Sequence, residues 1–292
     1  MRQSEKELHK NIEKAYELYH YLLILIVDVV LYAESRIELA RSKRIPSQAD
    51  LHPNTRFIDN ELVQKIRNNN QLLRFVDRHK LHWADHPELV REIYSKTLES
   101  EFYHPYMTAE ENGYAEDKKI ITQIYTHIIF PSELLASILE EQSIFWNDDL
   151  EFITSMIVKT IKKIKADDGP GKPLMDLYKN AEDRDYVVKL FRQTILHREE
   201  YIEYIRINTR NWDLDRIAFM DILIMQMAIA ELIGFPSIPT KVTLNEYLDI
   251  SKFYSTGKSS IFINGVLDKV VLQLKEEKKI RKSGRGLIGE ND

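Results

Sequence analysis

The residues with the clearest capacity for chemistry are three histidines, His79, His82 and His86, spaced at steps of three and four residues. On one continuous helix this spacing would place the imidazoles on one face, where they could bind a metal ion with Asp85 nearby. The next residue, Pro87, disfavours helical geometry at His86. Histidines on an ordinary protein surface are therefore the alternative interpretation, and we expect no metal site.

Two acidic pairs and one loop resemble catalytic motifs less closely. Asp148–Asp149 stands where a helix needs an N-terminal cap, and Asp167–Asp168 stands in a linker rich in glycine and proline. Residues 254–259 end in Gly-Lys-Ser, as a phosphate-binding loop does, but Lys252 occupies a position where that motif requires glycine, and no strand precedes it. No nucleophilic triad, zinc-protease motif or glycine-rich cofactor turn is present. The sequence therefore predicts a protein that is not an enzyme and needs no cofactor.

The low content of glycine and proline favours long helices, which would then position the candidate residues named above. The chain has 292 residues with only 9 Gly and 9 Pro, and it has no cysteine, which excludes disulfides and cysteine-based zinc sites. No alternating strand pattern of useful length occurs, so the fold class is expected to be all-α, a helical bundle. The net charge is -5, but residues 184–292 carry +2 and residues 1–183 carry -7. A nucleic-acid ligand should therefore favour the C-terminal third.

The first helix is expected to run from a capping box at Ser4–Glu7 to about Ala40, because apolar residues recur at steps of three and four. Its apolar run from Tyr21 to Tyr32 contains Asp28 and is shorter than the roughly 20 residues that a membrane span needs. No basic start leads into an apolar signal segment. We expect no membrane insertion and a cytoplasmic location.

Further periodic segments predict the remaining helices. Their expected ranges are 59–81, a helix opening at Pro87, one after a capping box at Thr108–Glu111, and then 133–142, 149–164, 184–206, 214–233, 244–253 and 260–274. The richest cluster of Gly and Pro divides the chain. The expected organisation is an N-terminal helical region over 1–166, a linker over 167–173, a helical domain over 174–275 and a flexible basic tail over 276–292.

Residues 211–268 carry an ordered series of polar and apolar identities. The series opens with Trp212, Leu214 and Arg216, continues through Glu231 and Leu232, and then through Ile238, Pro239, Val242, Asn245 and Glu246. Lys252 and a Phe-x-Asn-Gly-Val-Leu-Asp stretch complete it, with Phe262, Asn264, Gly265 and Asp268. This series closely resembles the C-terminal helices of the NusB family of bacterial transcription antitermination factors.

The resemblance implies that the chain binds RNA and proteins rather than catalysing a reaction. NusB-like proteins bind boxA, a single-stranded element of nascent leader RNA, jointly with the NusE ribosomal protein. The complex they form on RNA polymerase prevents early termination, notably on ribosomal RNA operons. By resemblance, the RNA-binding residues are Tyr254, Lys258, Phe262 and Lys252, and Asp221 faces the ribosomal partner. Lys258 replaces an acid that relatives often carry, which should favour phosphate.

The physical interpretation of the same residues is structural. Arg216, Glu231, Asn245 and Asp268 are expected to pair with other groups and fix helix packing, and Trp212 and Asn264 belong to the same signature. Thr243–Glu246 has the form of a capping box that would start a helix. Since Ile261, Val266 and Val270 continue a helical pattern around Gly265, this glycine is expected to permit close helix approach.

The resemblance covers about residues 184–275. The family opens with an arginine-rich helix that contacts RNA, whereas the first twenty residues here carry four basic and four acidic side chains. Either the chain begins downstream of that segment or its RNA contacts lie elsewhere. One alternative function therefore remains, a helical protein–protein adaptor with weak or lost RNA binding. A second, an RNA methyltransferase with a NusB-like domain, lacks the glycine-rich cofactor domain that it would need.

Overall fold

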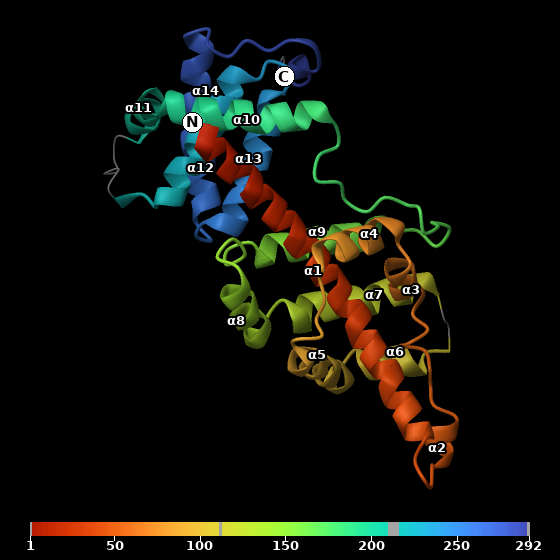
Figure 1. Cartoon of the computed structure of the whole chain (residues 1–292). Coiled ribbons are helices and arrows are strands. Elements are labelled where there is room, and N and C mark those ends of the chain that lie inside the picture. Colours follow the sequence, from red (N-terminus) through yellow and green to blue (C-terminus); the bar gives the residue numbers. More distant parts are fainter. Residues whose placement is uncertain (1, 111–112, 210–215, 291–292) are drawn as a thin grey trace. The chain divides into compact units, whose positions relative to one another are not determined.

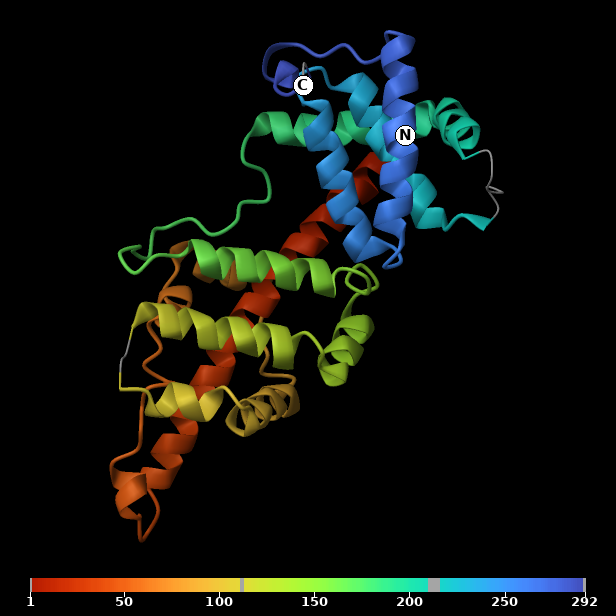
Figure 2. The same cartoon turned by 180° about the vertical axis from the view of Figure 1, so that it is seen from behind.

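The computed structural model describes residues 2–110, 113–209 and 216–290. Every regular element in these ranges is helical, which confirms the all-α prediction (Figures 1 and 2). The chain divides into two compact units. Unit 1 comprises Met1–Glu7 and Tyr178–Asp292, and unit 2 comprises Leu8–Leu177.

The longest element is α1, Arg2–Arg41. Its apolar run is buried on all sides from Leu18 to Val27, so it forms the centre of unit 2. Burial also raises the pKa of the Asp28 carboxyl, although a hydrogen bond from the backbone of Trp83 lowers it in part. Among the described residues, no helix is both long enough and apolar enough to cross a membrane.

In the described part of unit 2, α1 is followed by eight α-helices and a π-helical turn: α2 (Gln48–Leu51), α3 (Glu61–Arg67), α4 (Asn70–His79), α5 (Pro87–Glu99), α6 (Tyr103–Thr108), α7 (Tyr114–Ile124), η1 (Tyr125–Ile129), α8 (Glu133–Gln142) and α9 (Leu150–Lys163). The expected single helix over 59–81 is wrong. Asn68 ends α3, and the Asn69 side chain accepts hydrogen bonds from the backbone of Gln71 and Leu72, which starts a new helix.

The expected capping box at Thr108 is also wrong. Thr108 is the last residue of α6, and its hydroxyl donates to the carbonyl of His104, so it cannot cap the following helix. That helix, α7, begins only at Tyr114, after Gly113.

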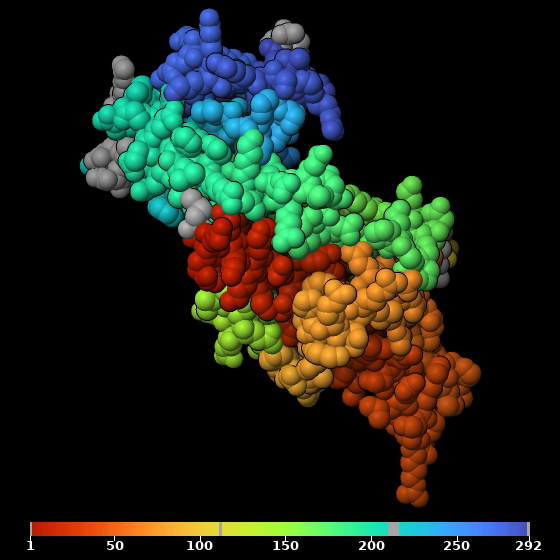
Figure 3. Space-filling view, turned by 45° about the horizontal axis from the view of Figure 1, so that its top comes forward, coloured from red at the N-terminus to blue at the C-terminus, as the bar shows by residue number. Residues whose placement is uncertain are grey.

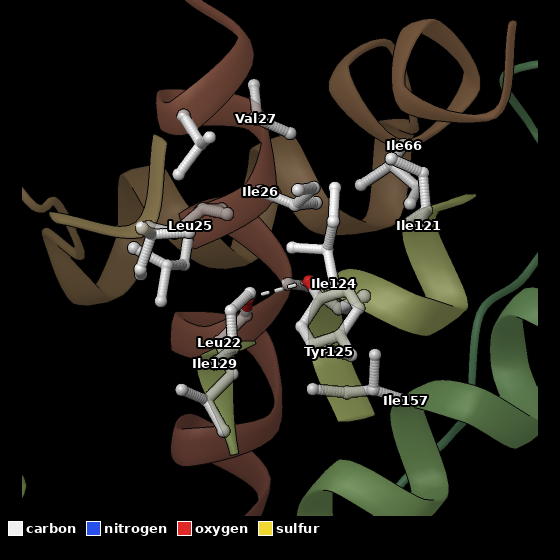
Figure 4. Packing of buried hydrophobic residues seen from close by; sticks show 14 of the residues in the cluster. Leu22, Leu25, Ile26, Val27, Ile66, Ile121, Ile124, Tyr125, Ile129 and Ile157 are labelled. Carbon is white, nitrogen blue, oxygen red and sulfur yellow. Dashed lines mark hydrogen bonds between the residues drawn. The ribbon is translucent and has the colours of Figure 1, made fainter. Parts of the chain in front are cut away.

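The core of unit 2 packs α1 against α3, α7, η1 and α9 (Figure 4). At its centre the fully buried Tyr125 donates a 2.9 Å hydrogen bond to the carbonyl of Leu22. The Trp83 indole stacks on Tyr21 at 3.8 Å and donates to the Tyr21 carbonyl at 2.9 Å. Burial of these aromatic rings, with their polar atoms paired, accounts for a rigid centre in unit 2.

Unit 1 contains α10 (Ala181–Leu196), α11 (Arg198–Asn208), α12 (Phe219–Gly234), α13 (Thr240–Tyr254), α14 (Ser259–Glu276) and a short 3₁₀ turn at Gly284–Leu287. The expected helix over 184–206 is two helices, broken at His197. The all-round apolar α12 is the central element, since α10, α11, α13 and α14 all contact it.

The expected linker over 167–173 does not separate the two units. The segment predicted as a linker packs on unit 2, where the Lys65 ammonium donates to the Asp168 carbonyl and Asn69 donates to the Lys172 carbonyl. The division between the units falls instead between Leu177 and Tyr178.

The tail after α14 is docked rather than flexible. Ser283 donates to the Pro236 carbonyl, and Gly286 lies so close that an added Cβ would be 2.0 Å from the Pro236 oxygen. The Glu290 carboxylate accepts a 2.7 Å bond from the backbone of Thr240, at the start of α13. Most of the tail is therefore part of the bundle.

Candidate nucleic-acid interface

The connection between α13 and α14 is fixed by a buried carboxylate. Asp221, on the first turn of α12, is 5% exposed and accepts hydrogen bonds from the hydroxyls of Ser255 and Ser259, the latter at 2.9 Å. The Ser259 hydroxyl also lies 2.8 Å from that of Thr256. Asp221 therefore holds the loop in place from beneath. Any effect that it has on a partner must pass through this loop.

Three of the four residues expected to bind RNA lie at or beside this loop. Lys258 is exposed at the N-cap of α14, and its neighbours Tyr254 and Phe262 are half-buried, at the end of α13 and in the first turn of α14. Lys252 lies one turn before the loop and pairs with Asp249 at 2.6 Å, a surface ion pair worth at most about 1 kcal/mol. The loop thus offers an exposed cation, with no carboxylate of the described residues within 4 Å, and two partly covered aromatic rings.

Two further exposed residues lie at or just before the start of α12, and the sequence analysis did not include them among the candidate RNA-binding residues. Phe219 is 72% exposed and is the first residue of α12. It lies two residues before Asp221, whose side chain holds the loop between α13 and α14. Arg216 is exposed, and in the described part of the chain it has no carboxylate within 4 Å. Because α12 is apolar on all sides, the sequence could not show which of its residues faces solvent.

Glu231, in contrast, has the structural role expected for it. It is 4% exposed and accepts hydrogen bonds from Thr243 at 2.7 Å, from Tyr247 at 3.3 Å and from Tyr186. Burial, together with the nearby Glu231 charge, raises the pKa of Tyr186 and of Tyr247, so both phenols stay protonated. One carboxylate therefore joins α10, α12 and α13.

This geometry corrects the interpretation of Thr243. The helix α13 begins at Thr240, so Thr243 and Glu246 lie inside it and form no capping box. Thr243 is fully buried against Glu231, whereas Glu246 and its neighbour Asn245 are exposed.

Gly265 does not serve close helix packing either. It is exposed on α14, and a Cβ added there would meet no atom within 4 Å. Asn264 and Asp268 lie on the same exposed side and share a 3.1 Å hydrogen bond. The remaining signature residue, Trp212, lies outside the described residues.

The three histidines considered as metal ligands have different partners. His79 stacks on Phe75 at 4.1 Å, His82 lies 3.7 Å from Asp85, and His86 bonds to the amide of Gln142 at 2.8 Å. The described residues contain no cluster of three or more potential ligands that could hold a metal ion.

Comparison with known proteins agrees with this fold and signature. The NusB family profile matches residues 151–272. Proteins named "Transcription antitermination protein NusB" are 36% identical to the chain in Salinibacter ruber and in Chloroherpeton thalassium, and 37% identical in Natranaerobius thermophilus. The matches cover 46%, 39% and 32% of this chain, and 87%, 54% and 68% of those proteins. No solved structure matches. With most of the Salinibacter protein covered at this identity, the chain belongs to the NusB family.

Proposed function

We propose that this protein is a transcription antitermination factor of the cytoplasm that binds boxA-type single-stranded RNA together with the NusE ribosomal protein. It would act within the RNA polymerase antitermination complex and support ribosomal RNA transcription. The observation that carries the proposal is the set of exposed cationic and aromatic side chains around the loop that Asp221 holds. The proposed activity is binding, and no bond is made or broken.

The composition of this end of unit 1 suits single-stranded RNA. Recognition of a single strand combines cations for phosphates with aromatic rings on which bases stack. Lys258 and Arg216 supply the cations, and Phe219 supplies the most exposed ring. Tyr254 and Phe262 would add the edges of half-buried rings, and Lys252 would contribute at the cost of its pair with Asp249.

The outer side of α14 is a suitable surface for the protein partner. Ile261 and Leu272 are 78% and 64% exposed, and both lie on the side that carries Gly265. A glycine inside a helix costs about 1 kcal/mol relative to alanine. Since packing within the unit does not require this glycine, a partner whose backbone approaches closely would explain it. We assign NusE to this surface, with Asp221 supporting it through the loop.

One observation favours the alternative function, a protein–protein adaptor. Residues 85–151 of unit 2 carry 15 acidic and 4 basic side chains, which is a strongly negative segment outside the RNA-binding signature. A basic protein could bind there while RNA binding is weak or lost.

A binding titration with boxA-like RNA, with and without purified NusE, separates the two functions. We expect measurable affinity for the RNA alone and tighter binding when NusE is present. A scrambled RNA of equal length serves as the control for sequence preference. RNA affinity that is absent in both conditions, while the chain is folded by circular dichroism, would refute the proposal and leave the adaptor function.

A further inference from the structure

Residues 1–183 carry a net negative charge, but within unit 2 the acidic and basic side chains are concentrated in different segments. While residues 85–151 are strongly acidic, α4 and the second half of α9 carry exposed basic residues. Five of these form what we call the α4–α9 basic surface: Arg74 and Arg78 on α4, Lys159 and Lys163 on α9, and Lys172 in the segment that follows α9.

Two adjoining hollows connect these five side chains. One, of about 390 Å³, is lined by Arg74 and Arg78, by the amide side chains of Asn70 and Gln71, and by one acid, Asp176. The other, of about 130 Å³, is lined by Lys159, Lys163 and Lys172. Pro173 lines both hollows, so the cations form one continuous surface around it.

Four of the five cations form no close ion pair with a carboxylate of the described residues. Lys172 lies 3.3 Å from Asp168. Within the described ranges, no carboxylate lies within 4 Å of Arg74, Arg78, Lys159 or Lys163. Arg74 and Arg78 are spaced four residues apart on α4, and so are Lys159 and Lys163 on α9. This spacing places the two Cβ atoms of each pair about 5–6 Å apart on one face of the helix.

The surface is held rigidly by unit 2. The segment after α9 runs beside α4 (Figures 1 and 3), where Asn70 donates to the Pro170 carbonyl and Leu174 donates to the Gln71 side chain, both at 2.9 Å. On the other side Thr160 of α9 lies 2.8 Å from the Tyr19 hydroxyl of α1. The cations therefore project from fixed elements and lose little backbone freedom on binding.

We propose that the α4–α9 basic surface binds the phosphodiester backbone of single-stranded RNA, as a second RNA contact outside the loop of unit 1. This inference rests on the proposed function. The surface is open and its cations are spread over two helices and two hollows, which suits a chain of phosphates better than a single enclosed anion. The aliphatic walls of the smaller hollow, Met156 and Leu174, would take the face of an unstacked base.

The salt dependence of RNA affinity tests this inference in the full chain. The variants are Arg74→Gln/Arg78→Gln and Lys159→Gln/Lys163→Gln, and the probe is a leader RNA that extends beyond its boxA-like element. For a single strand, removing one phosphate-binding cation lowers the slope of log affinity against log salt by about 0.7, so each pair should lower it by about 1.4. We expect about a tenfold weaker affinity at low salt for each double variant.

The matched control is Arg91→Gln/Lys119→Gln, which removes the same charge from exposed positions on α5 and α7. If both surface variants keep the affinity and slope of this control, the inference is overturned. Lys258→Glu distinguishes that outcome from failure of the proposed function, because it should still weaken RNA binding. A chain that binds no RNA in any form would overturn both. If the surface variants lost affinity only for polyglutamate and not for RNA, an acidic protein would be the ligand instead.

Discussion

The Glu231 carboxylate on α12 accepts a 2.7 Å hydrogen bond from the hydroxyl of Thr243 on α13, and both side chains are buried. The other bonds to this carboxylate also come from hydroxyls, those of Tyr186 and Tyr247. A buried carboxylate is expensive to desolvate unless its oxygens are bonded. The two helices that supply these donors, α10 and α13, are thereby fixed against α12.

Removing this carboxylate should destabilise unit 1. We expect Glu231→Ala to lower the free energy of unfolding by about 3 kcal/mol, because two buried hydroxyls and one partly buried hydroxyl lose their acceptor. Thr243→Val keeps the shape of its residue and removes one donor, so it should cost about 1–2 kcal/mol. Urea denaturation measures both, and hydrogen exchange in α12 and α13 localises the destabilised region. Wild-type exchange rates in Glu231→Ala would contradict this structural role.

The two tyrosines beside Glu231 predict a loss of stability in alkali. The pKa of Tyr247 is raised above its ordinary value of 10.0 in the folded chain, first by burial and then by Glu231. The folded state therefore retains a proton that the unfolded state releases, and stability is complete below pH 10 and falls as the pH rises further. Tyr247→Phe should make this decline shallower by about 1.4 kcal/mol for each pH unit above 10. Thermal unfolding between pH 8 and pH 11 measures it, and an identical slope in the variant would refute the assignment.

His20 predicts a loss of stability in acid. It is fully buried in unit 2, and burial lowers its pKa from 6.5 to about 4. The hydrogen bond with the Tyr16 carbonyl raises the pKa in part, and His79 lowers it further. The unfolded state therefore takes up a proton first, and stability falls as the pH decreases from 6.5 towards 4.

The change from this histidine is expected to be about 2–3 kcal/mol. His20→Phe retains an aromatic ring against Phe75, which stacks on His20 at 3.8 Å. Its stability should therefore vary less between pH 7 and pH 4 in urea titrations. His79→Phe, at an exposed position, is the control and should change the acid dependence much less.

Two glycines should respond to alanine in opposite directions. Gly265→Ala meets open space within α14 and should stabilise the chain by about 0.5–1 kcal/mol. Gly286→Ala would place its Cβ 2.0 Å from the Pro236 oxygen, so the tail must move and its contacts at Thr240 weaken, at about 1–3 kcal/mol. Melting temperatures that shift in the same direction would show that one of these environments is misassigned.

Three substitutions probe the loop in unit 1 and the residues beside it. Lys258→Glu should weaken RNA binding by about 1 kcal/mol, the scale of one charge-assisted contact. Phe219→Ala should cost about 1–3 kcal/mol if a base stacks on the exposed ring, and Tyr254→Ala should cost at least as much as Lys258→Glu.

The matched control for charge is Lys269→Glu, at another exposed position of α14. Fluorescence anisotropy at low salt measures the affinities, and circular dichroism verifies that each variant is folded. Affinity unchanged by Lys258→Glu, or reduced equally by Lys269→Glu, would remove Lys258 from the site.

Local signals in the sequence identified helices whose ends depend on their own residues. The expected range 133–142 agrees with α8, whose Ser132 hydroxyl caps the backbone of Leu135, and Pro87 opens α5 as expected. The break between α3 and α4 was missed although its cap is local: the Asn69 side chain caps α4, and it also donates to the Lys172 carbonyl, far along the chain. A periodic pattern contains no information about such distant partners.

The candidate site shows the same limit. The polar signature identified the family, and Glu231 was one of four signature residues expected to fix helix packing through ion pairs or hydrogen bonds. Its donors on α10 and α13 could not be deduced. Phe219 was missed because α12 is apolar around its whole circumference, so its sequence does not mark a solvent-facing side. Only the packing of the neighbouring helices shows that the Phe219 ring is exposed.

Because α1 contributes to both units, its first turn must wait for its partners during synthesis. Glu5 forms its ion pair with Arg192, which lies 187 positions later in the chain. At translation rates of about 5–20 residues per second, roughly 10–40 seconds pass before that arginine is made. During this interval unit 2 can fold around the rest of α1, whereas the turn that carries Glu5 still lacks the partner that fixes it.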